Sequence, residues 1–180
     1  KLTIQQRLIL PIILLGVVAL ISNALSVFGI QNVNSNAANI VDRYMVGLET
    51  LQNIRHTTTN IHKLALSHIV AAYYSTMITV VAQIKEEEKV LEAYLEEYED
   101  YVKEEEEEVY ARLLENYESF RHALVYLVCA SADSKTQEAY ACANGDVASF
   151  GSAMAGDIDE LYAAVSERTA DARQRLSFVY

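Results

Sequence analysis

Apolar residues recur at steps of three and four along four successive stretches of the chain. This spacing places them on one face of a helix, so each stretch predicts a helix with a single buried seam. The four predicted seams are Tyr44, Gly47, Leu51, Ile54, Thr58, Ile61, Ala65, His68 and Ala72; Met77, Val81, Ile84, Glu88, Leu91, Leu95, Tyr98 and Val102; Tyr110, Leu113, Tyr117, Phe120, Leu124, Leu127 and Ser131; and Val147, Phe150, Met154, Ile158, Leu161, Val165, Ala172, Leu176 and Val179.

The breaks between these stretches are short, at residues 72–75, residues 103–106 and Asn144-Gly145-Asp146. Short links make successive helices antiparallel, which predicts an all-α, up-down-up-down four-helix bundle. At the last break we expect Gly145 to end a helix in the left-handed conformation and Asp146 to cap the next helix. Residues 131–135 predict a kink or a short extra helix, with Asp133 or Ser134 as its N-cap.

The N-terminal segment is apolar enough to predict a transmembrane helix. No charged residue lies between Arg7 and Asp42, and residues 8–30 give 23 residues, against the roughly 20 that cross a bilayer. Lys1 and Arg7 favour a cytoplasmic N-terminus. The alternative is a cleaved signal peptide, because residues 8–21 alone form an apolar core of 14 residues. The uninterrupted helical pattern beyond Ile30 favours the anchor.

The predicted division of the chain follows from these segments. Residues 1–30 are expected to form the cytoplasmic N-terminus and membrane helix, and residues 31–175 the extracytoplasmic bundle. The apolar residues 176–180 are interpreted as the start of a second membrane helix.

The net negative charge of the chain limits the kinds of molecule that it can bind. The formal net charge is -11, and residues 85–118 alone contain fifteen acidic and four basic residues, so the rest of the chain is balanced. A surface of this kind repels phosphate backbones, so nucleic acid is not an expected partner. Two cysteines without C-x-x-C spacing, Cys129 and Cys142, are interpreted as buried free thiols rather than as a disulfide.

Candidate binding residues lie in the middle of the first stretch. Thr58 falls on the seam, and Arg55 and His62 flank it. We expect these residues to contact a bound anion or polar ligand at the dimer interface, or to form a solvated or inter-subunit polar face. The glutamates of residues 104–108 indicate a solvated helix end more than a cation site. No catalytic, metal-binding or cofactor-binding motif is present in the sequence, so neither enzyme activity nor a cofactor is expected.

Residues 2–10 (LTIQQRLIL) lead into the apolar segment and then into residues 30–35 (IQNVNS), and residues 141–146 (ACANGD) precede the last predicted helix. These residues resemble the corresponding parts of bacterial methyl-accepting chemotaxis proteins with a four-helix-bundle sensor. The resemblance implies a homodimeric receptor in the cell membrane with an extracytoplasmic four-helix sensor. It also implies cytoplasmic signalling partners, reached through domains that this sequence does not contain.

We therefore expect a chemoreceptor sensor domain that binds a small molecule or a solute-binding protein and transmits a displacement of its last helix across the membrane. Two alternatives stay open. One is the input domain of a membrane histidine kinase or diguanylate cyclase, and the other is a membrane-tethered coiled coil that senses nothing.

Overall fold

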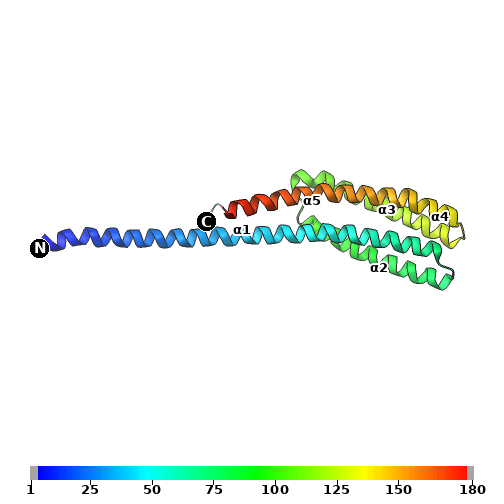
Figure 1. The fold of residues 1–180 in the computed structure, drawn as a ribbon, viewed down its shortest axis with the longest axis horizontal. Helices are drawn as coiled ribbons and strands as arrows, with labels where there is room; N and C mark the ends of the chain where they lie inside the picture. The colour runs from blue at the N-terminus through cyan, green and yellow to red at the C-terminus, as the bar shows by residue number, and fades with distance from the viewer. Residues whose placement is uncertain (1–3, 178–180) are drawn as a thin grey trace. The chain divides into compact units, whose positions relative to one another are not determined.

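The computed structural model describes the backbone of residues 4–177 and the side chains of residues 15–29 and 38–174. Within this range the chain is helical and contains no strand (Figure 1). The elements are α1 (Ile4–Val70), α2 (Tyr74–Glu99), the 3-10 turn η1 (Glu104–Glu106), α3 (Glu107–Ala132), α4 (Thr136–Cys142), the π-helical turn η2 (Ala143–Val147) and α5 (Ala148–Ser177).

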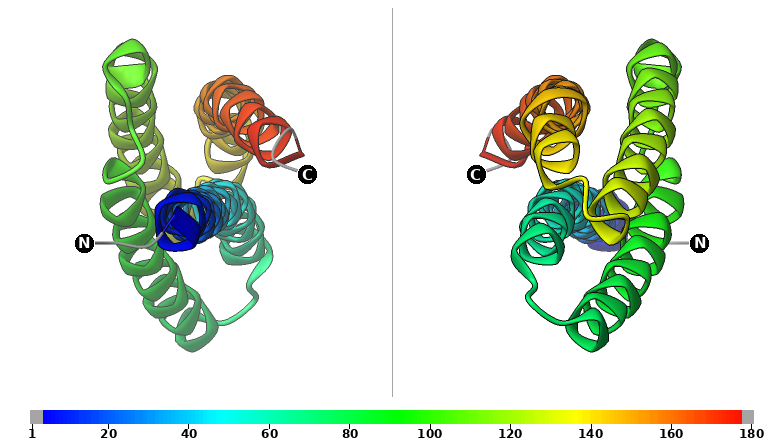
Figure 2. Two further views of the ribbon diagram at one scale, coloured as in Figure 1. Left: turned by 90° about the vertical axis from the view of Figure 1, so that its left-hand side faces the viewer. Right: turned by 90° about the vertical axis from the view of Figure 1, so that its right-hand side faces the viewer.

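The chain divides into two compact units. The first consists of Lys1–Arg43 with Thr169–Tyr180, and the second of Tyr44–Arg168. The second unit contains four helical arms: the end of α1, α2, α3, and the run from α4 through η2 into α5. Successive arms run in opposite directions and pack side by side, as the end-on views show (Figure 2). The predicted all-α bundle is confirmed for this unit.

Most predicted seam residues lie in the core of the bundle, but Met77 and Val81 are only partly buried and the neighbouring Val80 is buried instead. All seven seam residues of the third stretch are buried, and Leu51, Ile54, Ile61, Leu91, Leu161 and Val165 have no exposed surface. Two predicted positions, Leu176 and Val179, lie outside the residues whose side chains are described. Ala72 is exposed because α1 ends at Val70, before that position.

The boundary predicted at Gly145 is wrong. Residues 143–147 form η2, and no glycine in the described part of the chain has a positive φ. A π-helical turn accommodates one extra residue without ending the helix. Here Ala143 and Val147 both remain buried on either side of Asn144, Gly145 and Asp146. The helix therefore continues from α4 into α5.

The real break lies at Ser134, which has a φ of 63°. The amide of Ser134 donates to the carbonyl of Ser131 at 3.1 Å, and the amide of Lys135 donates to that of Ala130 at 2.9 Å. This pair of bonds is a Schellman motif, with serine where glycine is commoner. The short extra helix is confirmed as α4, but its N-cap is Lys135 without a side-chain cap, so the prediction of Asp133 or Ser134 as N-cap is wrong.

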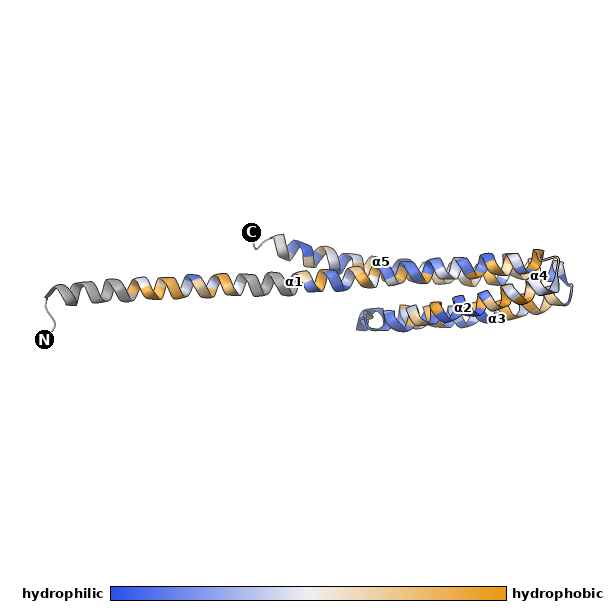
Figure 3. Cartoon of the chain, turned by 90° about the horizontal axis from the view of Figure 1, so that it is seen from below, coloured by the Kyte–Doolittle hydropathy of each residue, from blue (hydrophilic) through white to orange (hydrophobic). Residues whose placement is uncertain are grey.

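The first unit contains the N-terminal part of α1 and the end of α5. Across residues 15–29 the large apolar side chains are exposed; they are Leu15, Val17, Val18, Leu20, Ile21, Leu25, Val27 and Phe28 (Figure 3). Among the described residues no helix reaches the length and apolarity of a membrane span. The remainder of the predicted span, residues 8–14 and Ile30, and the predicted second span at residues 176–180 lie outside the described side chains.

Candidate binding groove between α1 and α5

A groove of about 250 Å³ lies between α1 and α5 in the bundle. Its walls come from three helices, and they are Thr58, Thr59 and His62 of α1, Phe120 of α3, and Ala148, Gly151, Ser152 and Ala155 of α5. A smaller pocket of about 40 Å³ adjoins it, shares Thr58, Thr59, Gly151 and Ala155, and adds Arg55, Met154 and Ile158. We call this combined space the α1–α5 groove.

Small residues on α5 create the space. Ala148, Gly151, Ser152 and Ala155 are spaced three, four and seven residues after the first, so they share one helix face. Beneath them the ring of Phe120 has no exposed surface. A Cβ atom built on Gly151 would lie 3.6 Å from Cε2 of Phe120, an ordinary contact distance. The aromatic ring therefore forms an apolar floor.

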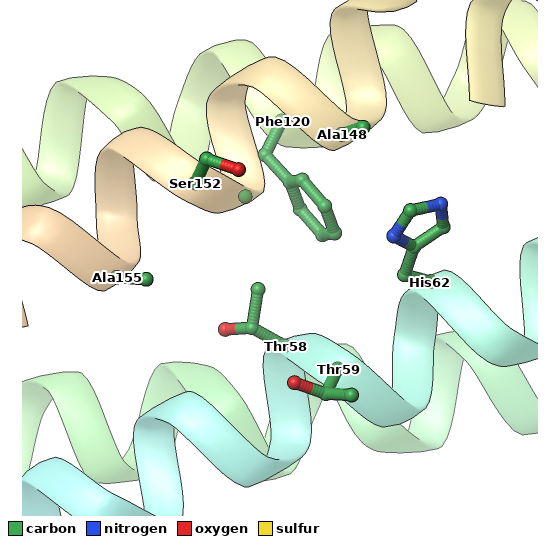
Figure 4. Close-up of a pocket in the computed structure, with 8 residues that line it drawn as sticks. Thr58, Thr59, His62, Phe120, Ala148, Ser152 and Ala155 are labelled. Carbon is green, nitrogen blue, oxygen red and sulfur yellow. The ribbon is translucent and has the colours of Figure 1, made fainter. Parts of the chain in front are cut away.

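The hydroxyl groups of α1 present lone pairs to the groove. Thr58 donates its proton to the carbonyl of Ile54 at 2.8 Å, and Thr59 donates to that of Arg55 at 3.0 Å. Because each hydroxyl has only one proton, what remains available to a ligand is acceptor capacity. His62 extends from α1 toward α5 (Figure 4), and its Nε2 is buried without a hydrogen-bond partner in the described structure.

Arg55 closes one end of the groove. Its guanidinium forms an ion pair with Asp159, and Nη2 also donates to the carbonyl of Ala155 at 3.4 Å. Its Nε is buried and has no partner among the described atoms. The positive charge is therefore already compensated by Asp159, while the Nε–H group is a buried donor without a partner among the described atoms.

The three residues singled out from sequence, Arg55, Thr58 and His62, thus line one continuous groove. Their role as ligand contacts stays a prediction. Thr59 on α1, Phe120 on α3, and Gly151 and Ser152 on α5 also line the groove and were not predicted from the sequence. The run of small residues on α5 is a signal that would have indicated Gly151 and Ser152, because it leaves space opposite a polar stretch of α1.

A polar network joins α3 to α5 below the groove. The carboxylate of Asp157 is almost fully buried; it accepts from Arg112 Nε at 2.6 Å and from Asn116 Nδ2 at 2.7 Å. Arg112 also reaches Glu160 at 2.6 Å. These bonds hold α5 against α3 at Asp157, which directly precedes the groove residue Ile158 in the chain.

A second polar contact holds the far end of α5 within the bundle. Arg168 forms an ion pair with the buried Glu106 of η1 and lies 5.6 Å from the centre of the Tyr44 ring on α1. Glu106 also accepts from the backbone amide of Lys103 at 3.2 Å. Burial, followed by the nearby Glu106 carboxylate, raises the pKa of Tyr98 beside this contact. Glu106 is therefore a packed structural residue, although the sequence analysis placed it within a solvated run.

The remaining candidate residues differ in part from expectation. Both cysteines are free, but Cys129 is exposed and only Cys142 is buried, where its thiol donates to the carbonyl of Ala123 at 3.4 Å. The seam residue Glu88 is half-buried, and burial raises the pKa of its carboxyl. In the part of the chain that the structure describes, no three His, Cys, Asp or Glu residues gather as metal ligands.

A family model described as a four helix bundle sensory module for signal transduction matches residues 1–180. No curated protein matches the chain.

Proposed function

Since the chain belongs to the family of four-helix-bundle sensory modules for signal transduction, we propose that it senses a small molecule bound in the α1–α5 groove. In this proposal α5 carries the signal as a displacement relative to α1. No catalytic step is part of the mechanism.

The observation that carries the proposal is the composition of the groove. Grooves that bind small molecules combine an apolar floor with a few converging polar groups. Here Phe120 supplies the floor, while Thr58, Thr59 and the unpartnered His62 Nε2 supply the polar groups. A ligand between α1 and α5 contacts both helices at once, so its binding energy depends on their relative position.

The test is a thermal-shift screen of the protein against amino acids, organic acids, amides and sugars. We expect at least one class to raise the melting temperature, because a ligand that binds only the folded state stabilises it. The variant Ala155→Leu fills the groove and should abolish that rise. Ala163→Leu, on an exposed position of the same helix, is the matched control and should keep it.

Two results would count against the proposal. One is a screen in which no class of compound stabilises the protein, which would favour a purely structural coiled coil. The other is a stabilising ligand whose effect survives Ala155→Leu, because binding would then occur elsewhere.

We further propose that residues 8–30 anchor the chain in the cell membrane, with the bundle on the extracytoplasmic side and two copies forming a homodimer. The support is the row of exposed apolar side chains at residues 15–29, because a contiguous apolar surface of this kind indicates an interaction with lipid or protein. Cytoplasmic signalling partners would be reached through domains that follow residue 180 in the whole receptor.

The anchor is tested by flotation of the chain with phosphatidylcholine liposomes. We expect the protein to float with the lipid and Leu20→Arg to reduce the bound fraction, because arginine at the centre of a membrane helix costs about 2.5–3.5 kcal/mol. Equal flotation of both proteins would contradict a spanning helix. Gln52→Arg, on an exposed face of the bundle, is the control for charge alone.

A further inference from the structure

The polar groups of the α1–α5 groove specify what kind of head group fits there. The larger part of the groove is lined by no Asp, Glu, Lys or Arg. The one cation at its end, Arg55, is paired with Asp159 and bonded to the carbonyl of Ala155. A charged ligand would leave water without finding an uncompensated counter-charge, which is unfavourable.

The groove offers a ligand both hydrogen-bond acceptors and hydrogen-bond donors. Thr58 and Thr59 have already donated their protons to the backbone, so they can only accept from a ligand. Arg55 Nε–H is a buried donor without a partner in the described structure, and arginine cannot accept. His62 Nε2 is also unpartnered, and it donates or accepts according to its tautomer.

We propose that the α1–α5 groove recognises a small uncharged amide, with its N–H groups directed at the threonine hydroxyls and its carbonyl at Arg55 Nε or His62 Nε2. This inference rests on the proposed sensing function. An amide offers a donor and an acceptor without net charge. A carboxylate only accepts, and an alkylammonium ion only donates, so each leaves one kind of group unmatched.

The apolar part of the ligand has a matching surface. Phe120 forms the floor of the larger pocket, and Met154 and Ile158 line the smaller pocket, all with at most 1% of their surface exposed. A short branched alkyl group fits against these side chains. The ligand class is therefore an amide carrying a compact apolar substituent.

The experiment is a titration of the ¹⁵N-labelled protein with three probes of the same carbon skeleton: isobutyramide, isobutyrate and isobutylamine at pH 7.5. Two-dimensional amide spectra report both the affinity and the residues affected. We expect isobutyramide to shift the resonances of Thr59, His62 and Gly151, and to bind about tenfold more tightly than either ion. Isobutylammonium leaves the buried Arg55 Nε without an acceptor, and isobutyrate loses hydration without finding an uncompensated counter-charge.

A matched pair of variants tests the threonine contact. Thr58→Val keeps the side-chain shape but removes the acceptor, and should weaken isobutyramide binding about fivefold, the value of one hydrogen bond. Thr57→Val changes a neighbouring buried threonine that does not line the groove and should leave the affinity unchanged.

The outcomes separate this inference from the sensing function. Tighter binding of isobutyrate or isobutylamine at the same resonances would overturn the amide assignment and leave the sensing function standing. Failure of all three probes to shift groove resonances would also overturn the amide assignment. The sensing function falls if the broader thermal-shift screen also fails, or if the stabilising effect of its ligand survives Ala155→Leu.

Discussion

His68 and Ser131 form a buried polar pair between α1 and α3. His68 Nδ1 lies 2.9 Å from the hydroxyl of Ser131, and His68 retains only 1% of its surface exposed. Burial lowers the pKa of His68 from its ordinary value of 6.5, because the charged imidazolium loses its hydration. Folding therefore favours the neutral form of this histidine over the charged form.

The lowered pKa predicts a pH dependence of stability. Below 6.5 the unfolded chain binds a proton at His68 more readily than the folded chain, so acidification favours unfolding. We expect the contribution of His68 to be complete at pH 7.5 and to fall as the pH drops below 6.5. Urea unfolding of the protein and of His68→Gln at pH 7.5 and 5.5 measures it. If the difference between the two proteins were the same at both pH values, the account of His68 would be wrong.

Replacing glycine by alanine is expected to have opposite effects on the free energy of unfolding at two helical positions, Gly151 and Gly47. Alanine in a helix is favoured over glycine by about 0.5–1 kcal/mol. At Gly151 the new methyl group has room, so Gly151→Ala should raise the free energy of unfolding by about that amount. At Gly47 the added Cβ would lie 2.9 Å from Cδ1 of Tyr101, so the ring must move and Gly47→Ala should lower stability. Chemical denaturation of both variants measures these changes.

The matched pair separates packing from helix propensity. If Gly47→Ala stabilised the protein as much as Gly151→Ala, the contact between Gly47 and Tyr101 would not constrain the bundle. A destabilising Gly151→Ala would contradict the space described above Phe120.

The contact between Arg168 and Glu106 joins α5 to the turn between α2 and α3. Because Glu106 is only 5% exposed, its charge depends on Arg168 and on the Lys103 amide for compensation. We expect Glu106→Gln to lower the free energy of unfolding by about 1–3 kcal/mol. Glu105→Gln, on the exposed neighbouring position, should change it little. Urea unfolding of both variants measures the contrast.

A double-mutant cycle with Arg168→Met assigns the effect to the pair. We expect the two substitutions to be strongly non-additive, because either one alone breaks the same interaction. Additive effects would show that Glu106 and Arg168 contribute to stability independently.

At the scale of the helices, the sequence predicted which faces are buried better than where each helix ends. Periodicity predicted most of the buried seams, because apolar residues spaced three and four apart lie on the same face of a helix. The predicted helix boundary at Gly145 was wrong. Asn144-Gly145-Asp146 has residues typical of helix caps, but here they form a π-helical turn whose flanking residues, Ala143 and Val147, are buried. The prediction from sequence also failed at Glu106 because a partner more than 60 residues away, Arg168, compensates its burial. Arg55, Thr58 and His62 of α1 were identified by their polarity, whereas Thr59 was not singled out and Phe120 of α3 joins the groove only through tertiary packing.

At the scale of the molecule, the two units have different proposed roles: one binds the ligand and the other anchors the chain. The bundle of Tyr44–Arg168 contains the groove, and Arg168 is its last residue on α5 before the helix enters the other unit. The exposed apolar residues 15–29 belong to that other unit. In the proposed mechanism, a change in the position of α5 within the bundle is passed on along this helix.

The central claim, that occupancy of the groove displaces α5 relative to α1, is tested most directly by a distance measurement with paired spin labels. With Cys129→Ser and Cys142→Ala as background, labels at the exposed positions Gln52 and Ala163 report on α1 and α5, and labels at Gln52 and Glu115 serve as the α1–α3 control. Saturation with a ligand found in the screen should change the first distance by about 1–2 Å, the size of helix shifts in signalling proteins, and leave the second unchanged. An α1–α5 distance that stays the same with the groove occupied would contradict the account.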